Sequence, residues 1–458
     1  MKFLIKIKIL VFYLVIRVYS NFRIKKGIGL PFALIIQTIP LTSSFMKKLL
    51  FFAESVSLAH IGRPLKLADW ADENGYQVYI ATGAKGIQLL NALGSKHTHI
   101  EIFSITGETF YQRVNQGKFF YTTAELEKYV TAEIKVISEV QPDFIISDFR
   151  LTTAISARVM QVPLINLSNA YWSPHYECKF PAPQTGIFNW MPEKFKQQFF
   201  NLLRPIAFKT FGKPLNDLRR KYLLTSVDDF RTHYTAGDYT LYMDHPEFIN
   251  LEQPPFRHAF LGPVVWAPAS VEKIKDLKKN SIYITMGSSG NNQVLTEITK
   301  ACLRLGRHMV ISGLSNTEAE NLISVVPELK EFAIIKPLID AEEVLANCDL
   351  TICHGGSGTV YQSLMASTPV LCFPHNPDQG LVAMAVKEGN WGSVISPSQT
   401  NSGFIFQAIT NLLNDHQKIK AVNQFSKKLK AHHTKDVWLS FLSAITTPSK
   451  KPILEEVQ

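Results

Sequence analysis

A histidine and five small residues, His354-Gly-Gly-Ser-Gly-Thr359, form the part of the chain best suited to hold an anion. They follow an apolar run that ends at Cys353 and precede a helical pattern that continues through Ala366. Glycines after a strand let a phosphate approach the backbone, and the N-terminus of the next helix offers free N–H groups and a partial positive charge. The pattern therefore fits a diphosphate, although a tight structural turn explains a glycine-rich segment equally well.

A histidine and an aspartate in the first half of the chain have side chains whose chemistry suits proton transfer. His60 falls in the expected loop between the first strand and the first helix, and Asp148 ends an apolar run that begins at Phe144. A hydroxyl has a pKa far above 7, so it needs a positioned base to lose its proton, and histidine suits neutral pH. A carboxylate would orient that histidine through the other ring nitrogen. The alternatives are a structural loop histidine and a helix N-terminal acid.

Two arginines, Arg63 and Arg150, flank the candidate base and its partner. Either could bind an acidic acceptor or a phosphate, but we expect both to be solvated. An aromatic-rich stretch follows at 170–200, and its default interpretation is core packing.

Short apolar runs alternate with helical stretches and would position these residues. The first half of the chain predicts strands at 49–53, 77–82, 143–148 and 162–166, with helices at 64–74 and 152–160. The second half predicts strands at 281–286, 308–312, 332–335, 350–353 and 370–373. Buried strands joined by helices indicate parallel sheets, so we expect an α/β protein of two Rossmann-like, doubly wound domains. Ligands of such sheets lie at the carboxyl ends of the strands, which predicts a site in the cleft between the domains.

The composition along the chain suggests five parts. Residues 1–45 are a basic and apolar extension, 46–265 the first domain, 266–280 a proline- and lysine-containing linker, 281–445 the second domain and 446–458 a tail.

The span from His354 to Gln379 closely resembles the nucleotide-sugar site of the UDP-glycosyltransferase superfamily, glycosyltransferase family one, in a bacterial-type member. The resemblance extends over most of 46–442 and implies the GT-B fold. In that family the histidine and the small residues after it hold the donor diphosphate. The resemblance assigns this role to His354, Ser357, Gly358 and Thr359, and to Ser288 in a second loop.

Three further positions compare with the family's donor site. An acid-glutamine pair binds the sugar hydroxyls in the family, and Asp378-Gln379 match it. The family's ribose-binding glutamate is Gln362 here, which can still form a hydrogen bond but without the charge. The aromatic residue that stacks on the base, often a tryptophan, corresponds to Ile335. The resemblance implies a UDP- or dTDP-sugar donor.

In the first domain, the resemblance makes His60 the catalytic base and Asp148 its partner. The family usually has a glycine before this histidine and a proline three residues later; here Ala59 precedes His60 and Pro64 follows four residues later. The variable stretch that corresponds to 170–200 forms the acceptor pocket in the family, which implies a hydrophobic acceptor. Two further matching segments, 214–219 and 244–247, are interpreted as scaffold.

The activity that the resemblance implies is transfer of a sugar to a hydroxyl with inversion. The sequence has no Asp-x-Asp pair to clamp a metal-bound diphosphate, so we expect no metal and no cofactor beyond the nucleotide-sugar co-substrate. Two alternatives stay open: a nucleotide-sugar epimerase on the same fold, and a catalytically silent sugar-nucleotide-binding protein.

Charge and cysteine content limit the compartment and the partners. The net charge is +10, but seven basic residues and no acid lie in 1–45, so the rest is nearly balanced and a nucleic-acid partner is excluded. Five scattered cysteines without C-x-x-C spacing indicate reduced thiols in a cytoplasmic protein. We interpret 1–45 as a start codon assigned too early. The alternative is an anchor that gives peripheral membrane contact for a lipid acceptor.

Overall fold

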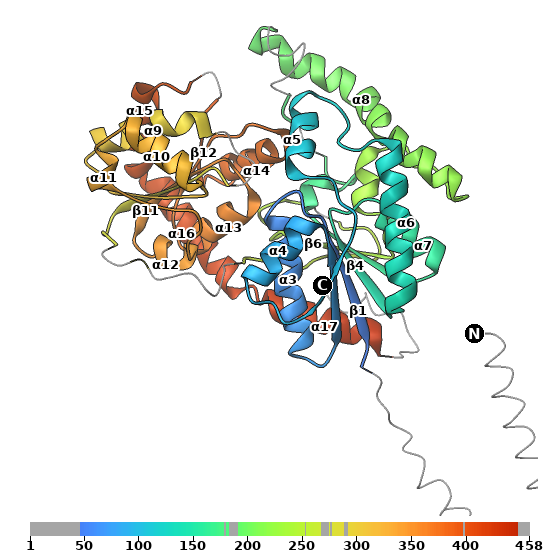
Figure 1. Ribbon diagram of the computed structural model, residues 1–458. Coiled ribbons are helices and arrows are strands. Elements are labelled where there is room, and N and C mark those ends of the chain that lie inside the picture. The colour runs from blue at the N-terminus through green and yellow to red at the C-terminus, as the bar shows by residue number, and fades with distance from the viewer. Residues whose placement is uncertain are drawn as a thin grey trace, which may run out of the picture. The chain divides into compact units, whose positions relative to one another are not determined.

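Two parallel β-sheets form the framework of the protein (Figure 1). The computed structural model describes residues 46–177, 180–182, 191–251, 253–266, 274, 277–287, 292–396 and 399–447. The predicted extension at 1–45, the tail after 447 and much of the predicted linker lie outside these ranges. Among the described residues, no helix is long and apolar enough to cross a membrane.

The first sheet has seven strands in the order β3-β2-β1-β4-β5-β6-β7. These strands are β1 (Lys48–Ala53), β2 (Gln77–Thr82), β3 (Thr98–Glu101), β4 (Phe144–Asp148), β5 (Leu164–Ser168), β6 (Tyr239–Tyr242) and β7 (His258–Phe260). Its connecting helices are α3 (Ala59–Asp72), α4 (Ala84–Ala92), α5 (Gly107–Asn115), α6 (Thr123–Val140), α7 (Thr153–Met160) and α8 (Glu193–Lys221), with 3₁₀ turns at Ala170–Trp172 and Phe230–Tyr234. The apolar β1 is buried along nearly its whole length, as expected of a central parallel strand.

The second sheet has six strands in the order β10-β9-β8-β11-β12-β13. These strands are β8 (Ser281–Thr285), β9 (Met309–Ser312), β10 (Ala333–Lys336), β11 (Cys348–Cys353), β12 (Val370–Cys372) and β13 (Gly392–Val394). A 3₁₀ turn at Asn292–Val294 precedes its helices, α9 (Leu295–Arg304), α10 (Asn316–Val325), α11 (Leu329–Phe332), α12 (Ala341–Leu345), α13 (Ser357–Met365), α14 (Pro377–Glu388), α15 (Ser402–Leu413), α16 (His416–Ala431) and α17 (Thr434–Thr446). The predicted fold of two Rossmann-like domains is confirmed, with each predicted strand within two residues of an observed one.

The beginning of α3 differs from the prediction. The sequence predicts a helix from Pro64, because proline is favoured in the first turn. The helix instead begins at Ala59 and contains Pro64 in its interior. His60 therefore lies in the first turn of a helix and not in a loop, which fixes its backbone more firmly than a loop would.

The last helix, α17, packs on the first domain although its residues follow the second (Figure 1). Trp438 is fully buried there, and its indole N–H donates to the carbonyl of Leu67 in α3 at 3.0 Å. Residues 434–445, which the sequence-based division assigns to the second domain, thus contribute to the core of the first.

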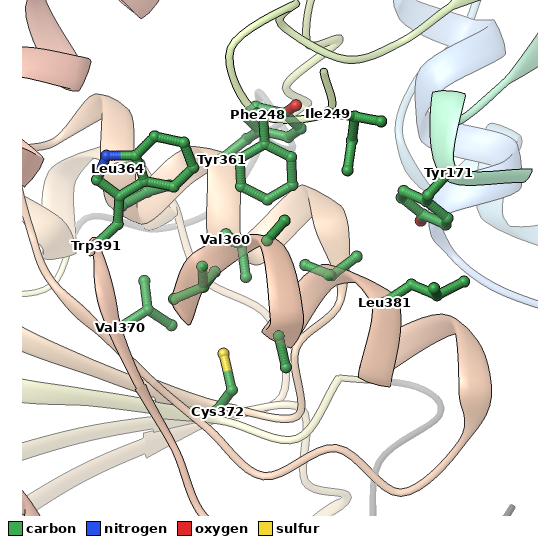
Figure 2. Close-up of a cluster of buried hydrophobic side chains, with 14 of the residues drawn as sticks. Tyr171, Phe248, Ile249, Val360, Tyr361, Leu364, Val370, Cys372, Leu381 and Trp391 are labelled. Atoms are coloured by element: carbon green, nitrogen blue, oxygen red, sulfur yellow. The ribbon is translucent and has the colours of Figure 1, made fainter. Parts of the chain in front are cut away.

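A hydrophobic cluster joins segments of both domains (Figure 2). Phe248, from the segment after β6, stacks on Trp391 at 5.5 Å between ring centroids and contacts Tyr361 of α13 at 4.7 Å. This contact holds the segment after β6 against α13, the helix that follows the glycine-rich turn.

Candidate active site

The first part of the site is a histidine-carboxylate pair at the ends of two neighbouring strands. β1 pairs with β4 in a register that sets Ala53 opposite Asp148, so Asp148 lies near the start of α3, the helix after β1. His60 Nδ1 lies 2.8 Å from Asp148 Oδ1. The Asp148 carboxylate is 1% exposed and the His60 side chain 19%. The structure therefore brings together the two residues that the sequence proposed as base and partner.

The contact with Asp148 determines which nitrogen of His60 can accept a proton. A carboxylate only accepts hydrogen bonds, so Nδ1 carries the hydrogen and donates it, which leaves the lone pair on Nε2. The ring also stacks on Phe149, with centroids 4.5 Å apart and planes 11° from parallel. Phe149 has a φ of 59°, a conformation that is costly for a bulky residue. That backbone directs the ring onto His60.

Arg63 lies in the same turn of α3 as His60 and binds the same carboxylate. Its Nε donates to Asp148 Oδ2 at 3.1 Å and its Nη2 to Oδ1 at 3.0 Å. Nη2 also lies 3.0 Å from His60 Nδ1. Because both nitrogens carry hydrogens in this tautomer, they do not bond to each other, and both donate to Asp148. The prediction of a solvated Arg63 is wrong, because the side chain is buried and grips both oxygens of Asp148.

Arg150 is likewise buried, and the prediction that it is solvated is also wrong. Its Nε donates to Glu133 Oε1 at 2.7 Å, and the guanidinium lies 4.1 Å from the centroid of the Tyr129 ring. Both members of this ion pair have fully buried side chains. The pair fixes the chain that follows Asp148 to helix α6.

The second part of the site is the turn between β11 and α13, where His354 is buried between two glycines. A Cβ built on Gly287 would lie 2.5 Å from the imidazole, and one on Gly356 would also lie 2.5 Å from it. Burial lowers the pKa of His354 to about 4, although a hydrogen bond with the backbone of Thr285 acts to raise it. The ring is therefore neutral at pH 7. Nδ1 has no hydrogen-bond partner among the described residues.

The first turn of α13 offers backbone donors beside His354. No side chain caps this helix at Gly356, and its first internal bond runs from Val360 N–H to the Gly356 carbonyl. The N–H groups of Ser357, Gly358 and Thr359 therefore precede the helical pattern and can point to an anion. A Cβ on Gly358 would meet no heavy atom within 4 Å, so the backbone is open to a ligand there. Ser288, the predicted fifth diphosphate contact, lies outside the described residues.

Gln362, the predicted ribose contact, is one turn further along α13. Its Nε2 donates to the carbonyl of Trp266 at 2.9 Å. The Trp266 indole covers Gly62, where an added Cβ would lie 2.8 Å from the ring. Gly62 lies between His60 and Arg63 in α3. A glutamate could not donate to this carbonyl, which gives a structural reason for glutamine here.

The predicted sugar contacts, Asp378 and Gln379, begin α14. Pro377 occupies the first turn, and the Asn376 side chain caps the helix by accepting from Gln379 N–H at 3.0 Å. Asp378 Oδ1 accepts from the Trp172 indole N–H at 2.7 Å. Gln379 is 1% exposed, and its Oε1 accepts from His375 N–H at 2.8 Å. Asp378 is thus bound by the first domain, and Gln379 by its own loop.

Comparison with known proteins identifies the family. The model of the erythromycin biosynthesis protein CIII-like C-terminal domain matches residues 304–435. A PGL/p-HBAD biosynthesis glycosyltransferase of Mycobacterium tuberculosis is 31% identical over 393 residues, which cover 83% of this chain and 88% of that one. The chain belongs to the bacterial UDP-glycosyltransferase family. A PGL/p-HBAD biosynthesis rhamnosyltransferase of Mycobacterium bovis is 31% identical over 373 residues, 80% of this glycosyltransferase and 81% of the relative.

Solved structures support the GT-B fold of this glycosyltransferase. The spinosyn rhamnosyltransferase SpnG, solved with thymidine diphosphate, aligns with a TM-score of 0.63 at 17% identity, over 87% of this chain and all of that one. The calicheamicin glycosyltransferase CalG4 aligns with a TM-score of 0.64 at 16% identity, over 87% of this chain and 99% of that one.

Sequence reasoning missed two polar contacts of this glycosyltransferase. Arg63 lies three residues after His60, a spacing that places both on one face of a helix, so the sequence held a usable signal. Trp172 lies in the aromatic-rich stretch at 170–200, which the sequence assigns to core packing or the acceptor pocket, and nothing in its local sequence indicates a bond to Asp378, 206 residues away. Among the described residues, no group of three or more histidines, cysteines or acids is placed to hold a metal ion.

Proposed function

We propose that this glycosyltransferase moves a sugar from a UDP- or dTDP-sugar to a hydroxyl of a hydrophobic acceptor, with inversion and without a metal. The observation that carries the proposal is the 2.8 Å contact between His60 Nδ1 and Asp148 Oδ1, which leaves Nε2 as a proton acceptor. A positioned base contributes on the order of 10² to 10⁴ in rate.

The proposed reaction is a single displacement. His60 Nε2 takes the proton of the acceptor hydroxyl while the acceptor oxygen bonds to the anomeric carbon of the sugar. The bond from that carbon to the diphosphate oxygen breaks, and the nucleoside diphosphate leaves with the electron pair. Attack opposite the leaving group inverts the anomeric centre, and Asp148 stabilises the imidazolium that forms.

The turn around α13 would stabilise the leaving group. The N–H groups of Ser357, Gly358 and Thr359 and the helix dipole supply the positive potential that a metal supplies in other enzymes. His354 would contact the diphosphate, Gln362 the ribose, and Asp378 with Gln379 the sugar. The thymidine diphosphate bound by SpnG supports the dTDP alternative.

Aromatic side chains beside His60 support a hydrophobic acceptor. Phe149 lies against the His60 ring and packs with Phe110 and Phe120, at 5.6 and 5.9 Å between centroids. Tyr234 contacts Phe149 at 5.8 Å between centroids and stacks on Trp172 at 5.0 Å, and Phe110, Phe120 and Tyr234 are buried in one hydrophobic cluster. SpnG has also been solved in complex with spinosyn aglycone.

A donor and acceptor panel tests the proposal. UDP- and dTDP-sugars are incubated with small hydrophobic alcohols and phenols, with and without EDTA, and nucleoside diphosphate release is measured. We expect release that depends on acceptor, resists EDTA and yields a product of inverted anomeric configuration by NMR. Release of diphosphate without acceptor, or an isomerised donor, would support an epimerase instead.

A further inference from the structure

A buried polar chain continues from Arg63 away from the His60-Asp148 pair. Arg63 Nη1 donates to Asn169 Oδ1 at 3.0 Å, and Asn169 Nδ2 donates to Asp244 Oδ1 at 3.0 Å. The hydroxyl of Tyr361 in α13 donates to the same Asp244 oxygen at 3.1 Å. These four residues are at least 92% buried. The chain therefore leads from the first turn of α3 to the helix of the donor site.

The direction of each hydrogen bond in this chain is fixed by its partners. A guanidinium only donates and a carboxylate only accepts, so the Asn169 oxygen must face Arg63 and its NH₂ group must face Asp244. The Tyr361 hydroxyl accepts from His245 N–H at 3.0 Å, which leaves its own hydrogen for Asp244. Asp244 Oδ2 accepts from Ala170 N–H at 2.6 Å. A rotated amide or a missing hydroxyl would leave a buried group unpaired.

Burying the Asp244 carboxylate costs free energy, so an aspartate is poorly suited to this position if its only role is to fill space. It is fully buried, and burial raises the pKa of Asp244 to about 6 although it accepts hydrogen bonds from Ala170, Asn169 and Tyr361. Apolar side chains of similar volume usually stabilise a fold as well as buried charged groups do. The geometry thus favours a role in orientation over the scaffold role that the sequence suggested for 244–247.

Two neighbouring residues of α13 are linked to the start of α3 through separate sets of contacts. Tyr361 does so through Asp244, Asn169 and Arg63, and Gln362 through the carbonyl of Trp266, whose indole covers Gly62. The first turn of the same helix carries the proposed diphosphate contacts. Figure 2 shows Tyr361 on this helix beside Phe248, within the hydrophobic cluster that joins the two domains.

We propose that Arg63, Asn169, Asp244 and Tyr361 are positioning residues that hold the His60-Asp148 pair in register with the donor-binding helix α13. Tyr361 and Asn169 fix Asp244 and Arg63, Arg63 fixes both oxygens of Asp148, and Asp148 orients the His60 ring. The inference rests on the proposed function, because it takes His60 as the base.

The variant Tyr361→Phe tests this chain with the smallest change, since it removes one hydroxyl and keeps the packed ring. We expect kcat to fall on the order of tenfold, the effect of losing a hydrogen bond to a charged group. The donor KM and the affinity for nucleoside diphosphate should stay within about twofold, because the ring and the N-terminus of α13 are unchanged. Tyr76→Phe is the matched control: its hydroxyl lies 3.2 Å from Thr446 Oγ1, outside the polar chain, and its kcat should be unchanged.

The deciding measurement repeats Tyr361→Phe in a His60→Ala background, with single-turnover product formation as the readout. If the hydroxyl acts through His60, the residual rate should change by less than about twofold. An equal fall in both backgrounds, or no fall in the wild-type background, would overturn the proposal. Asp244→Asn should give the same pattern and covers the case that Tyr361→Phe perturbs folding. Wild-type activity of His60→Ala alone would instead refute the proposed base, whatever Tyr361→Phe does.

Discussion

If His354 contacts the donor diphosphate as proposed, binding of a nucleoside diphosphate should protonate its ring. In the free protein burial lowers the pKa of His354 to about 4, and Nδ1 has no partner among the described residues. A hydrogen bond with the Thr285 backbone opposes this lowering of the pKa. If that bond takes the single N–H of the neutral ring and Nδ1 is the atom that meets the diphosphate, the lone pair of Nδ1 would repel a phosphate oxygen. Contact through Nδ1 would then need a second proton on the ring.

The size and sign of the effect follow from linkage. The bound diphosphate is negative, so it raises the pKa of His354 in the complex above that of the free protein. Between these two pKa values, each unit of lower pH tightens binding by up to about tenfold, or about 1.4 kcal/mol. We therefore expect the dissociation constant of the nucleoside diphosphate to decrease as the pH is lowered from 7 toward 5.

Isothermal titration calorimetry in buffers of different ionisation enthalpy measures this proton uptake directly. His354→Asn is the matched variant, because it keeps a hydrogen-bond donor but does not titrate. Subtracting its proton uptake from that of the wild type removes the contribution of the nucleotide's own phosphate. Identical pH dependence for wild type and His354→Asn would refute the argument that His354 contacts the diphosphate as a cation.

Three further predictions concern the sugar contact, the N-terminal segment and acid stability. Asp378→Ala should raise the donor KM and leave the affinity for free nucleoside diphosphate unchanged, since the expected partner of Asp378 is a sugar hydroxyl. If calorimetric titration shows that the affinity for nucleoside diphosphate falls as much as the affinity for the donor, the assignment of Asp378 to the sugar is wrong. A chain that starts at Met46 should fold and retain activity on a soluble acceptor, because β1 begins at Lys48; an insoluble or inactive product beside an active full-length protein would contradict this. Burial lowers the pKa of His233 to about 3, so below pH 6.5 the unfolded chain binds more protons than the folded protein. The free energy of unfolding should therefore fall by up to about 1.4 kcal/mol per pH unit between pH 6.5 and pH 3. Urea unfolding should show a smaller fall for His233→Leu than for the wild type, and equal falls in both proteins would count against this prediction.

The sequence was sufficient for the strands, and its resemblance to the glycosyltransferase family supplied the pairing of His60 with Asp148. Buried parallel strands are centred on short apolar runs, so the strand at 77–82, with its apolar residues at 78–81, could be predicted to the residue. The carboxyl ends of adjacent parallel strands meet at one edge of a sheet, which agrees with the observed contact of His60 and Asp148. The start of α3 could not be predicted, because Pro64 signals a helix beginning and the tertiary packing of Gly62 against Trp266 is invisible locally. The burial of Arg63 and Arg150 depends on carboxylates 85 and 17 residues away. Charged side chains are mostly exposed, so the sequence alone predicts exposed arginines here. The burial of Arg63 and Arg150 becomes evident only when their carboxylate partners are known.

Transfer and nucleotide binding should separate in the variant His60→Ala, because His60 is proposed to act on the acceptor hydroxyl while the turn around α13 holds the donor. We expect the transfer rate to fall on the order of 10² to 10⁴-fold while calorimetry finds nucleoside diphosphate affinity within about twofold of wild type. Transfer within threefold of the wild-type rate, or a parallel loss of nucleoside diphosphate binding, would contradict the assignment of His60 as the base.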